Sequence, residues 1–391
     1  MGSSHLFTRN RLIVAFITIA GLLILNTLWG IASTTNLGGG DFWGYWSATF
    51  LLRNGQNPYD PDAMRLVQAT QMHTGLDFTI MSWNPPTLFV VILPLTLLSI
   101  TSAKFIWLIA NLTLIATTIL MLIKLYLPQD NAKLKLMFLL LAFLMPQILS
   151  GVYVGQVTIL VTFGLVTSMI LIRKNHWFWA GAILILTTIK PHLVVLQIIY
   201  LFLYMIQRKK IQGWAGILLA GSVFLVILFG LRPQLISDLV GLSKIAPTKW
   251  YTPTIGGWIS FIGATEIARY LIVLFLPIPF ILAKYHTSFS MELSIALLTL
   301  ITVPFTFFGW SYDQVILLIP IAQIFYWLYQ LRAVALKYVL STFMILVVVI
   351  NYYQKVTDTY EVYYVWVPLF WCLVFGITWY YYYTRLTYIH E

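Results

Sequence analysis

The chain is poor in charged residues and contains a single cysteine. Only 9% of its 391 residues are charged and 60% are hydrophobic, whereas a soluble domain carries about 25% charged residues. Cys372 lies inside an apolar run, which excludes a disulfide framework and a cysteine metal site. This composition predicts one integral membrane domain that covers residues 1–391.

Signatures of nucleotide, metal and nucleic-acid binding are also missing. The sequence has no glycine-rich phosphate loop. The net charge of +11 comes from short Lys and Arg clusters between apolar runs, which is not a nucleic-acid signal. We therefore expect no cofactor, no metal and no nucleic-acid partner. The histidines, which show no metal-ligand spacing, are His5, His73, His176, His192, His286 and His390.

Apolar runs of spanning or nearly spanning length recur along the whole chain. They lack the alternation of a membrane barrel, so they predict an all-α, polytopic transmembrane bundle of about 11–13 helices. The first run, preceded by two arginines, is typical of a signal anchor. The runs cover residues 12–33, 86–100, 103–126, 134–150, 156–172, 177–189, 191–206, 212–231, 266–283, 291–308, 311–331, 335–352 and 362–383.

The basic clusters predict which loops share a side of the membrane. Residues such as Lys135, Arg173 and Lys284 fit the cytoplasmic side, which places residues 151–156, 190–192, 232–257, 309–313 and 351–361 outside the cytoplasmic membrane. Residues 86–126 conflict with this pattern, because they must cross an odd number of times and yet look like two helices. Either one of these helices is re-entrant, or residues 124–135 are an exception to the rule.

Two long polar segments are expected on the outer side. Residues 34–84 carry four aspartates and two arginines, a net charge of −2, and residues 232–256 carry a net charge of +2. Together they suggest a site that handles hydroxyl chemistry at one end and an anionic group at the other. Within the first segment, residues 41–54 predict a short interfacial helix with its aromatic and aliphatic residues toward lipid, and residues 57–61 predict a turn.

Asp41 is the leading candidate for catalysis. It follows the first apolar run, where an acid at bilayer depth costs about 2.5–3.5 kcal/mol and is a functional candidate by default. Three preceding glycines allow a sharp turn and a close approach to a ligand. As a general base it would accept a proton from an attacking hydroxyl. The alternative is that Asp41 caps the helix that follows.

Further polar residues stand at the ends of apolar runs. Asp313 is either a second carboxylate of the site or a helix N-terminal acid. Lys190 either binds a phosphate as a point charge or extends from a helix end toward water, and a lone histidine such as His192 is more typical of a packed core. The remaining candidates have capping, turn or solvated roles as alternatives: Asn84, Gln156, Arg232, Lys244 and Lys249.

An ordered set of short motifs resembles glycosyltransferase family 87. The resemblance implies a GT-C type bundle with a long first extracytoplasmic loop and a polyprenyl-phosphate-linked sugar as donor. It also implies that Asp41 is the first-loop base. Many relatives carry a histidine pair where this chain has Tyr312-Asp313-Gln314. The motifs, which add Tyr45, Asp60 and Trp310 as substrate contacts, are Asp41-Phe42, Tyr45-Trp46, Asn57-Pro58-Tyr59-Asp60, Asn84-Pro85-Pro86, Gly155-Gln156, Lys190-Pro191 and Trp310-Ser311-Tyr312-Asp313-Gln314.

The main hypothesis is an inverting membrane glycosyltransferase. It would move a sugar, with mannose expected because the family includes mannosyltransferases, from the polyprenyl-phosphate carrier to a lipid or glycan acceptor outside the membrane. One alternative is a transporter or flippase of a lipid-linked sugar. Another is an inactive scaffold for envelope assembly. Formation of a glycosidic product distinguishes the first hypothesis from both.

Overall fold

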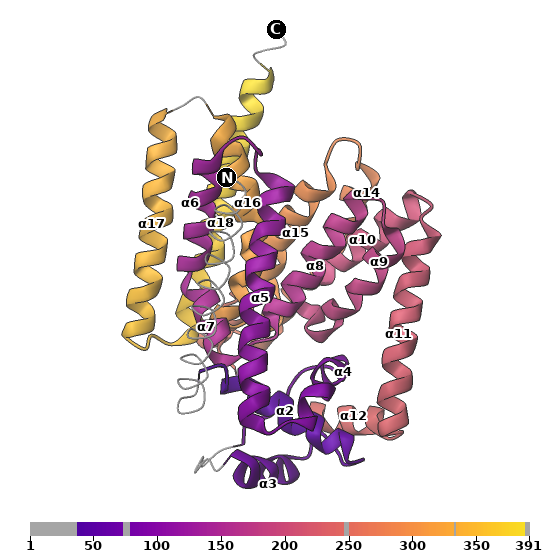
Figure 1. Ribbon diagram of the computed structural model, residues 1–391. Coiled ribbons are helices and arrows are strands. Elements are labelled where there is room, and N and C mark those ends of the chain that lie inside the picture. The colour runs from indigo at the N-terminus through magenta and orange to yellow at the C-terminus, as the bar shows by residue number, and fades with distance from the viewer. Residues whose placement is uncertain (1–36, 73–78, 246–249, 332–333, 388–391) are drawn as a thin grey trace, which may run out of the picture.

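The computed structural model describes residues 37–72, 79–245, 250–331 and 334–387. The predicted signal anchor and Lys249 lie outside these ranges. Within them every regular element is a helix, which confirms the predicted all-α polytopic bundle (Figure 1). The elements are α2 Gly40–Arg53, α3 Pro61–Met72, α4 Thr87–Ile92, η1 Leu93–Leu97, α5 Ile100–Tyr126, α6 Ala132–Leu144, α7 Pro146–Val154, α8 Thr158–Arg173, α9 Trp177–Ile183, η2 Leu184–Ile189, η3 Pro191–Leu193, α10 Val195–Gln207, α11 Ile211–Leu231, α12 Leu235–Ile245, α13 Ile255–Phe261, η4 Glu266–Phe275, α14 Ile278–Lys284, α15 Met291–Phe305, η5 Ser311–Leu317, α16 Leu318–Gln330, α17 Val334–Val356, η6 Glu361–Val365 and α18 Trp366–Thr387.

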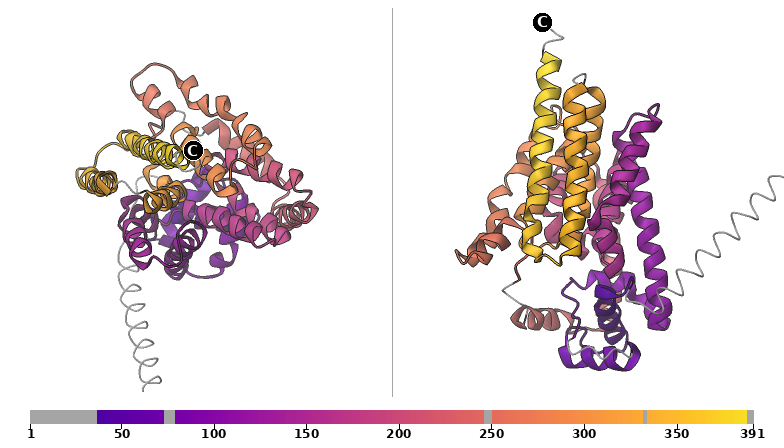
Figure 2. Two further views of the ribbon diagram at one scale, coloured as in Figure 1. Left: turned by 90° about the horizontal axis from the view of Figure 1, so that it is seen from above. Right: turned by 90° about the vertical axis from the view of Figure 1, so that its left-hand side faces the viewer.

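Six helical stretches among the described residues are long and apolar enough to cross a membrane. The pair α6 and α7 passes the same test only when taken together, as a broken span or a re-entrant loop. It is bent by 49° where Pro146 cannot donate a backbone hydrogen bond. Seen from two further sides, the long helices run roughly side by side (Figure 2). The six stretches are Ile100–Tyr126, Ile211–Leu231, Glu266–Lys284, Ser311–Gln330, Val334–Val356 and Glu361–Thr384.

Short helices gather at one end of the bundle, here called the loop end. It carries α2, α3, α4 and α12, so both predicted polar segments lie on the same side (Figure 1). The stretch Thr87–Leu97 also lies there, and at about 1.5 Å per residue it is too short for a hydrocarbon core of about 30 Å. Within residues 86–126 only α5 is long and apolar enough to cross, so one candidate span replaces the two expected helices.

The helix predicted over residues 41–54 forms as α2, but its predicted environment is wrong. Its aromatic side chains are buried in protein and do not face lipid: Phe42 is 0% and Trp46 is 1% exposed. Phe42 stacks on Trp107 of α5, with ring centres 5.5 Å apart. Trp46 Nε1 donates a hydrogen bond to the Leu95 carbonyl of η1 at 3.1 Å. The non-spanning stretch α4–η1 folds back over α2, which a local pattern cannot show.

The predicted turn after α2 is confirmed. The Tyr59 N–H donates to Asn57 Oδ1 at 2.9 Å, an Asx turn that reverses the chain before α3. Tyr59 itself is buried, and its hydroxyl donates to the Asn84 carbonyl at 3.0 Å. The turn thus ties the first polar segment to the chain that enters α4.

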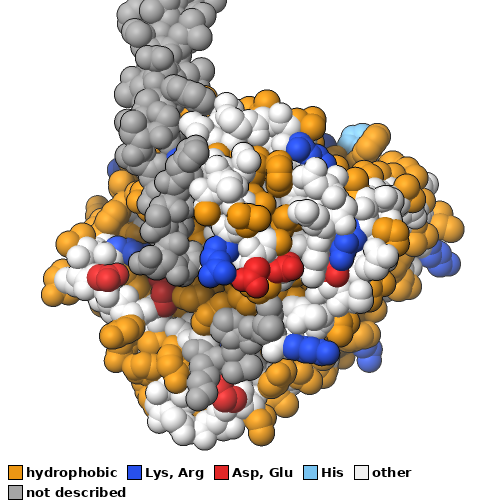
Figure 3. Space-filling model, turned by 90° about the horizontal axis from the view of Figure 1, so that it is seen from below, with side chains coloured by type: hydrophobic (Ala, Val, Ile, Leu, Met, Phe, Trp, Pro, Cys, Tyr) orange, Lys and Arg blue, Asp and Glu red, His pale blue; other side chains and the backbone are white. Residues whose placement is uncertain are grey.

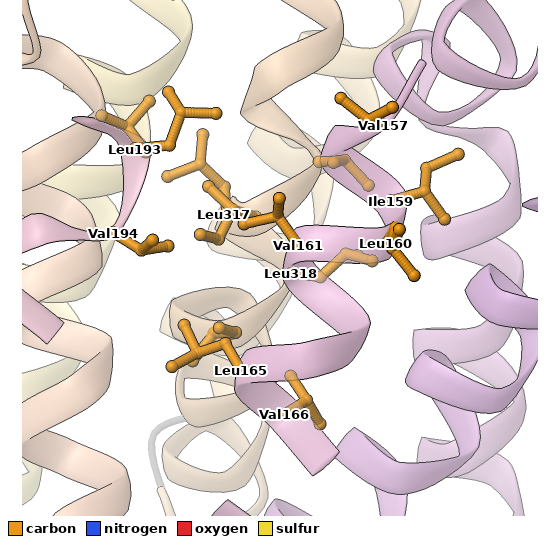
Figure 4. Packing of buried hydrophobic residues seen from close by; sticks show 14 of the residues in the cluster. Val157, Ile159, Leu160, Val161, Leu165, Val166, Leu193, Val194, Leu317 and Leu318 are labelled. Atoms are coloured by element: carbon orange, nitrogen blue, oxygen red, sulfur yellow. The ribbon is translucent and has the colours of Figure 1, made fainter. Parts of the chain in front are cut away.

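An apolar layer centred on α8 supports the loop end from within the bundle. Val161 and Leu165 of α8 pack against residues at the end of η3 and at the junction of η5 and α16, namely Leu193, Val194, Leu317 and Leu318 (Figure 4). Dense packing of this kind stabilises a membrane bundle mainly by dispersion, because lipid is as apolar as the side chains. The layer fixes the starts of α8, η3 and η5 relative to one another.

The helices α9 and α11 touch through glycines. A Cβ at Gly181 would lie 1.9 Å from the Gly213 carbonyl oxygen, and a Cβ at Gly216 would lie 2.0 Å from the Phe178 carbonyl oxygen. Small residues at such crossings let helix backbones approach closely. The α9–α11 contact therefore tolerates no side chain at these positions.

We predict that Gly216→Ala lowers the apparent melting temperature in detergent, because the added methyl forces α9 and α11 apart. Overpacking of this kind typically costs about 1–3 kcal/mol. Gly221→Ala is the matched control on the same helix, since a Cβ there meets no atom within 4 Å. Equal melting temperatures for the two variants would contradict the proposed contact.

Candidate active site

Asp41, Tyr45 and Gln156 form a hydrogen-bonded chain at the loop end. Gln156 Nε2 donates to Asp41 Oδ2 at 2.5 Å, and the Tyr45 hydroxyl donates to Gln156 Oε1 at 3.0 Å. The Val157 N–H donates to the same amide oxygen at 2.9 Å. Two donors on the oxygen orient the amide group, so its NH2 faces the carboxylate of Asp41. Residues 115 positions apart are thereby joined.

Glycines hold α2 against the end of α7. Gly155 ends α7 in the left-handed region with φ of 72°, and a Cβ there would lie 2.6 Å from the Gly38 carbonyl oxygen. A Cβ at Gly40 would lie 2.8 Å from Cβ of Val154. The glycine run was expected to approach a ligand. Its close approach is instead to α7, and it places Asp41 beside Gln156.

The second carboxylate, Asp313, is surrounded by donors. Lys190 Nζ lies 2.7 Å from Asp313 Oδ1, and the Thr158 hydroxyl donates to the same oxygen. The Trp310 N–H donates to Asp313 Oδ2 at 2.9 Å. The Lys190 and Asp313 side chains are only 9% and 3% exposed. These contacts hold Asp313 in place, so it is suited to anchor the Lys190 side chain in the site.

Tyr312 joins the two carboxylates into one site. Its ring centre lies 5.3 Å from Lys190 Nζ, and an interaction of its side chain with Asp41 lowers the pKa of that carboxyl. Trp310 stacks on the Tyr312 ring with centres 6.3 Å apart. The sequence placed Tyr312 in a motif but did not single it out. Its position directly before Asp313 was the only available signal.

The environment of Asp41 favours its protonated form more than water does. Burial raises the pKa of this carboxyl above its ordinary value of 3.8, and the nearby charge of Asp313 raises it further. The cation of Lys190 and the side chain of Tyr312 partly oppose that rise. The two carboxylates of the site therefore differ, because Asp313 has an ion-pair partner and Asp41 has a raised pKa.

His192 is held neutral. Burial, and then the neighbouring Lys190, lower the pKa of His192 to about 4. At neutral pH the ring thus offers a hydrogen bond but no positive charge. Asn84 lies at the same edge, since its Nδ2 donates to the Ile189 carbonyl beside Lys190 at 3.3 Å.

Four predicted site residues are not drawn into this cluster. Asp60 caps α3, with Oδ1 accepting the Asp62 N–H at 2.9 Å. Arg232 pairs with Asp238 and donates to the Gly55 carbonyl at 2.7 Å, which links the two polar segments. Lys244 is exposed, and Lys249 lies outside the described residues.

Viewed from below, charged side chains of both signs lie on this end (Figure 3). In the described part of the chain no three His, Cys, Asp or Glu side chains group as metal ligands.

These features define a polytopic helical membrane protein with a buried carboxylate and ion-pair site at one end of its bundle. The model of glycosyltransferase family 87 matches residues 83–349, more than half of the chain, and the chain belongs to this family. It is therefore a membrane glycosyltransferase. The comparisons with curated proteins and with solved structures gave no match. The matched range includes Gln156, Lys190 and Asp313 but begins after Asp41.

We predict that Lys190→Met destabilises the protein, because it leaves Asp313 buried without its cation. Breaking a buried pair on one side typically costs about 3–5 kcal/mol, measured by thermal unfolding in detergent. Arg65→Met is the control, since the Arg65–Asp62 pair is exposed and such pairs contribute about 0–1 kcal/mol. The double variant Lys190→Met/Asp313→Asn should recover part of the loss. No recovery would contradict the ion-pair explanation.

Proposed function

We propose that this glycosyltransferase transfers a sugar, specifically mannose, from a polyprenyl-phosphate carrier to a hydroxyl group of a lipid or glycan acceptor, with inversion at the anomeric carbon. Asp41 is the general base. The observation that carries the proposal is the contrast between two neighbouring carboxylates. Asp313 is paired with Lys190, whereas burial raises the pKa of Asp41. Carboxyl groups in environments that differ in this way can take different roles in one site.

The proposed reaction is a single displacement. The acceptor oxygen attacks the anomeric carbon from the face opposite the carrier, and its proton passes to the Asp41 carboxylate. The bond between the anomeric carbon and the phosphate oxygen breaks, and its electron pair leaves with the lipid phosphate. One attack from the opposite face inverts the configuration. Gln156 keeps the carboxylate oriented toward the incoming hydroxyl.

Lys190 supplies charge for the leaving group. An ammonium group has three N–H donors. Among the described residues, Asp313 accepts one hydrogen bond from Lys190 Nζ. The others remain for a phosphate, whose developing charge a fixed cation stabilises. Neutral His192, Tyr45, Asn84 and Trp310 are suited to hydrogen bonds or ring contacts with the sugar. Outside the central cluster, the proposed contacts to the acceptor or the carrier are Asp60, Arg232, Lys244 and Lys249.

The distribution of basic residues supports an outward-facing site in the cytoplasmic membrane. Lys124 and Arg173 lie in the last turns of α5 and α8, and Arg173 donates to the Leu125 carbonyl at 2.9 Å. α5 starts at the loop end, so these residues lie at the opposite end of the bundle (Figure 1). Basic residues mark the cytoplasmic side. The loop end then faces outward, where lipid-linked sugars are used.

We predict that Asp41→Asn lowers transfer by about 10²–10⁴-fold, the usual contribution of a positioned general base. Purified protein in detergent would receive polyprenyl-phosphate-mannose or a nucleotide-linked mannose, and only the lipid donor should react. Asp62→Asn, in the same segment but exposed, should keep normal activity. NMR of the product should show the inverted anomer.

Three outcomes would overturn this proposal. Full activity of Asp41→Asn removes Asp41 as base, and a product of retained configuration removes the single displacement. Movement of labelled carrier lipid across liposomes without any glycosidic product favours a flippase.

We further predict that activity falls on acidification at a higher pH than an ordinary aspartate would give. The base must be ionised, so a raised pKa of Asp41 moves the acid limb of kcat/KM upward. The measurement is kcat/KM against pH under conditions where the protein stays folded. An acid limb centred at or below 3.8, the ordinary pKa of this group, would contradict the assignment.

A further inference from the structure

A polar cluster next to the site is not used by the proposed mechanism. It joins Ser311, the first residue of η5, to Lys355 near the end of α17 and to Glu361 at the start of η6. Both Lys355 and Glu361 lie beyond the range matched by the family model, which ends at residue 349. We call these three residues the Ser311 clamp.

In the clamp, one residue of η5, Ser311, forms hydrogen bonds through its backbone N–H and its hydroxyl. The Ser311 N–H donates to Glu361 Oε2 at 2.9 Å, and the Ser311 hydroxyl donates to Glu361 Oε1 at 3.0 Å. Lys355 Nζ lies 2.9 Å from the Ser311 hydroxyl oxygen and 3.0 Å from Glu361 Oε1. Two contacts from one carboxylate fix both the position and the rotation of the first turn of η5.

A further contact holds the same turn to η6. Gln314 Nε2 donates to the Tyr364 carbonyl at 3.2 Å. Between Ser311 and Gln314 stand the two residues that reach into the site, Tyr312 and Asp313. The direction of both side chains therefore depends on how η6 and the end of α17 hold η5.

We propose that Glu361, supported by Lys355, is a positioning residue for the transfer reaction. It holds the first turn of η5 so that the Tyr312 ring stays beside Lys190 in the site while Asp313 pairs with Lys190. This inference rests on the proposed function, because it takes Asp41 as the base.

The exposure of the clamp distinguishes positioning from bulk stability. The Lys355 and Glu361 side chains are 31% and 26% exposed, whereas Ser311 is 1% exposed. A partly exposed ion pair contributes little to the free energy of unfolding. Loss of this ion pair should therefore alter the positions of Tyr312 and Asp313 while it changes the melting temperature little.

The ionisation of Asp41 reports on Tyr312. The titratable groups that face Asp41 are Lys190, Tyr312, Asp313 and Tyr45. The interaction with the Tyr312 side chain lowers the pKa of Asp41, so a displaced Tyr312 lets that pKa rise. Removing the negative charge of Glu361 would by itself favour ionised Asp41 and act in the opposite direction. The sign of the change thus separates positioning from simple electrostatics.

The test is kcat/KM against pH for four variants in detergent or liposomes. Tyr312→Phe and Glu361→Ala should each move the acid limb upward by about one pH unit, the size expected for one hydrogen bond to a carboxylate. Glu361→Gln retains an acceptor for Ser311 and should leave the limb near its normal position. Asp358→Asn is the matched control, since Asp358 is an exposed acid three residues from Glu361.

An upward shift in Glu361→Ala that is absent from Glu361→Gln and Asp358→Asn supports the proposal. An unmoved or downward limb in Glu361→Ala, with an upward limb in Tyr312→Phe, overturns it. The base assignment fails separately, through an active Asp41→Asn. In that event amide hydrogen exchange of residues 311–317 decides: faster exchange in Glu361→Ala than in Glu361→Gln supports the clamp, and equal exchange overturns it.

Discussion

The buried ion pair between Lys190 and Asp313 is the interaction on which the loop end depends. Charges taken out of water must be paired, and this pair also satisfies the Thr158 hydroxyl at the start of α8. Three elements, α8, η3 and η5, are therefore required to meet at one point. The apolar layer of Leu193 and Leu317 behind them fixes the same meeting from the core side.

Asp41 acquires its character from that arrangement. Burial and the charge of Asp313 raise the pKa of Asp41. The charge of Lys190 and the side chain of Tyr312 lower it in part. Two identical carboxyl groups are thus suited to different tasks by their surroundings, one as an anchor and one as a proton acceptor. The Ser311 clamp extends this control to helices outside the region that the family model covers.

Much of the fold was predictable. The apolar runs between residues 86 and 383 all fall on helices or broken helices, and the turn after α2 forms where predicted. Asp41, Gln156, Lys190 and Asp313 were expected on one side and do meet. The lipid-facing surface of α2 was predicted wrongly, because α4–η1 covers it. Tyr312 and Glu361 were missed, since an isolated tyrosine or glutamate at a helix end carries no distinctive pattern.

The sequence by itself determined where helices form and which end of each carries polar residues. This follows because backbone groups in lipid must be satisfied within each segment, so hydrophobic pattern and length suffice. Only the tertiary structure decided which polar ends touch. Gln156 reaches Asp41 across 115 positions and Lys190 reaches Asp313 across 123. Such contacts depend on how the whole bundle packs, and no local pattern records that packing.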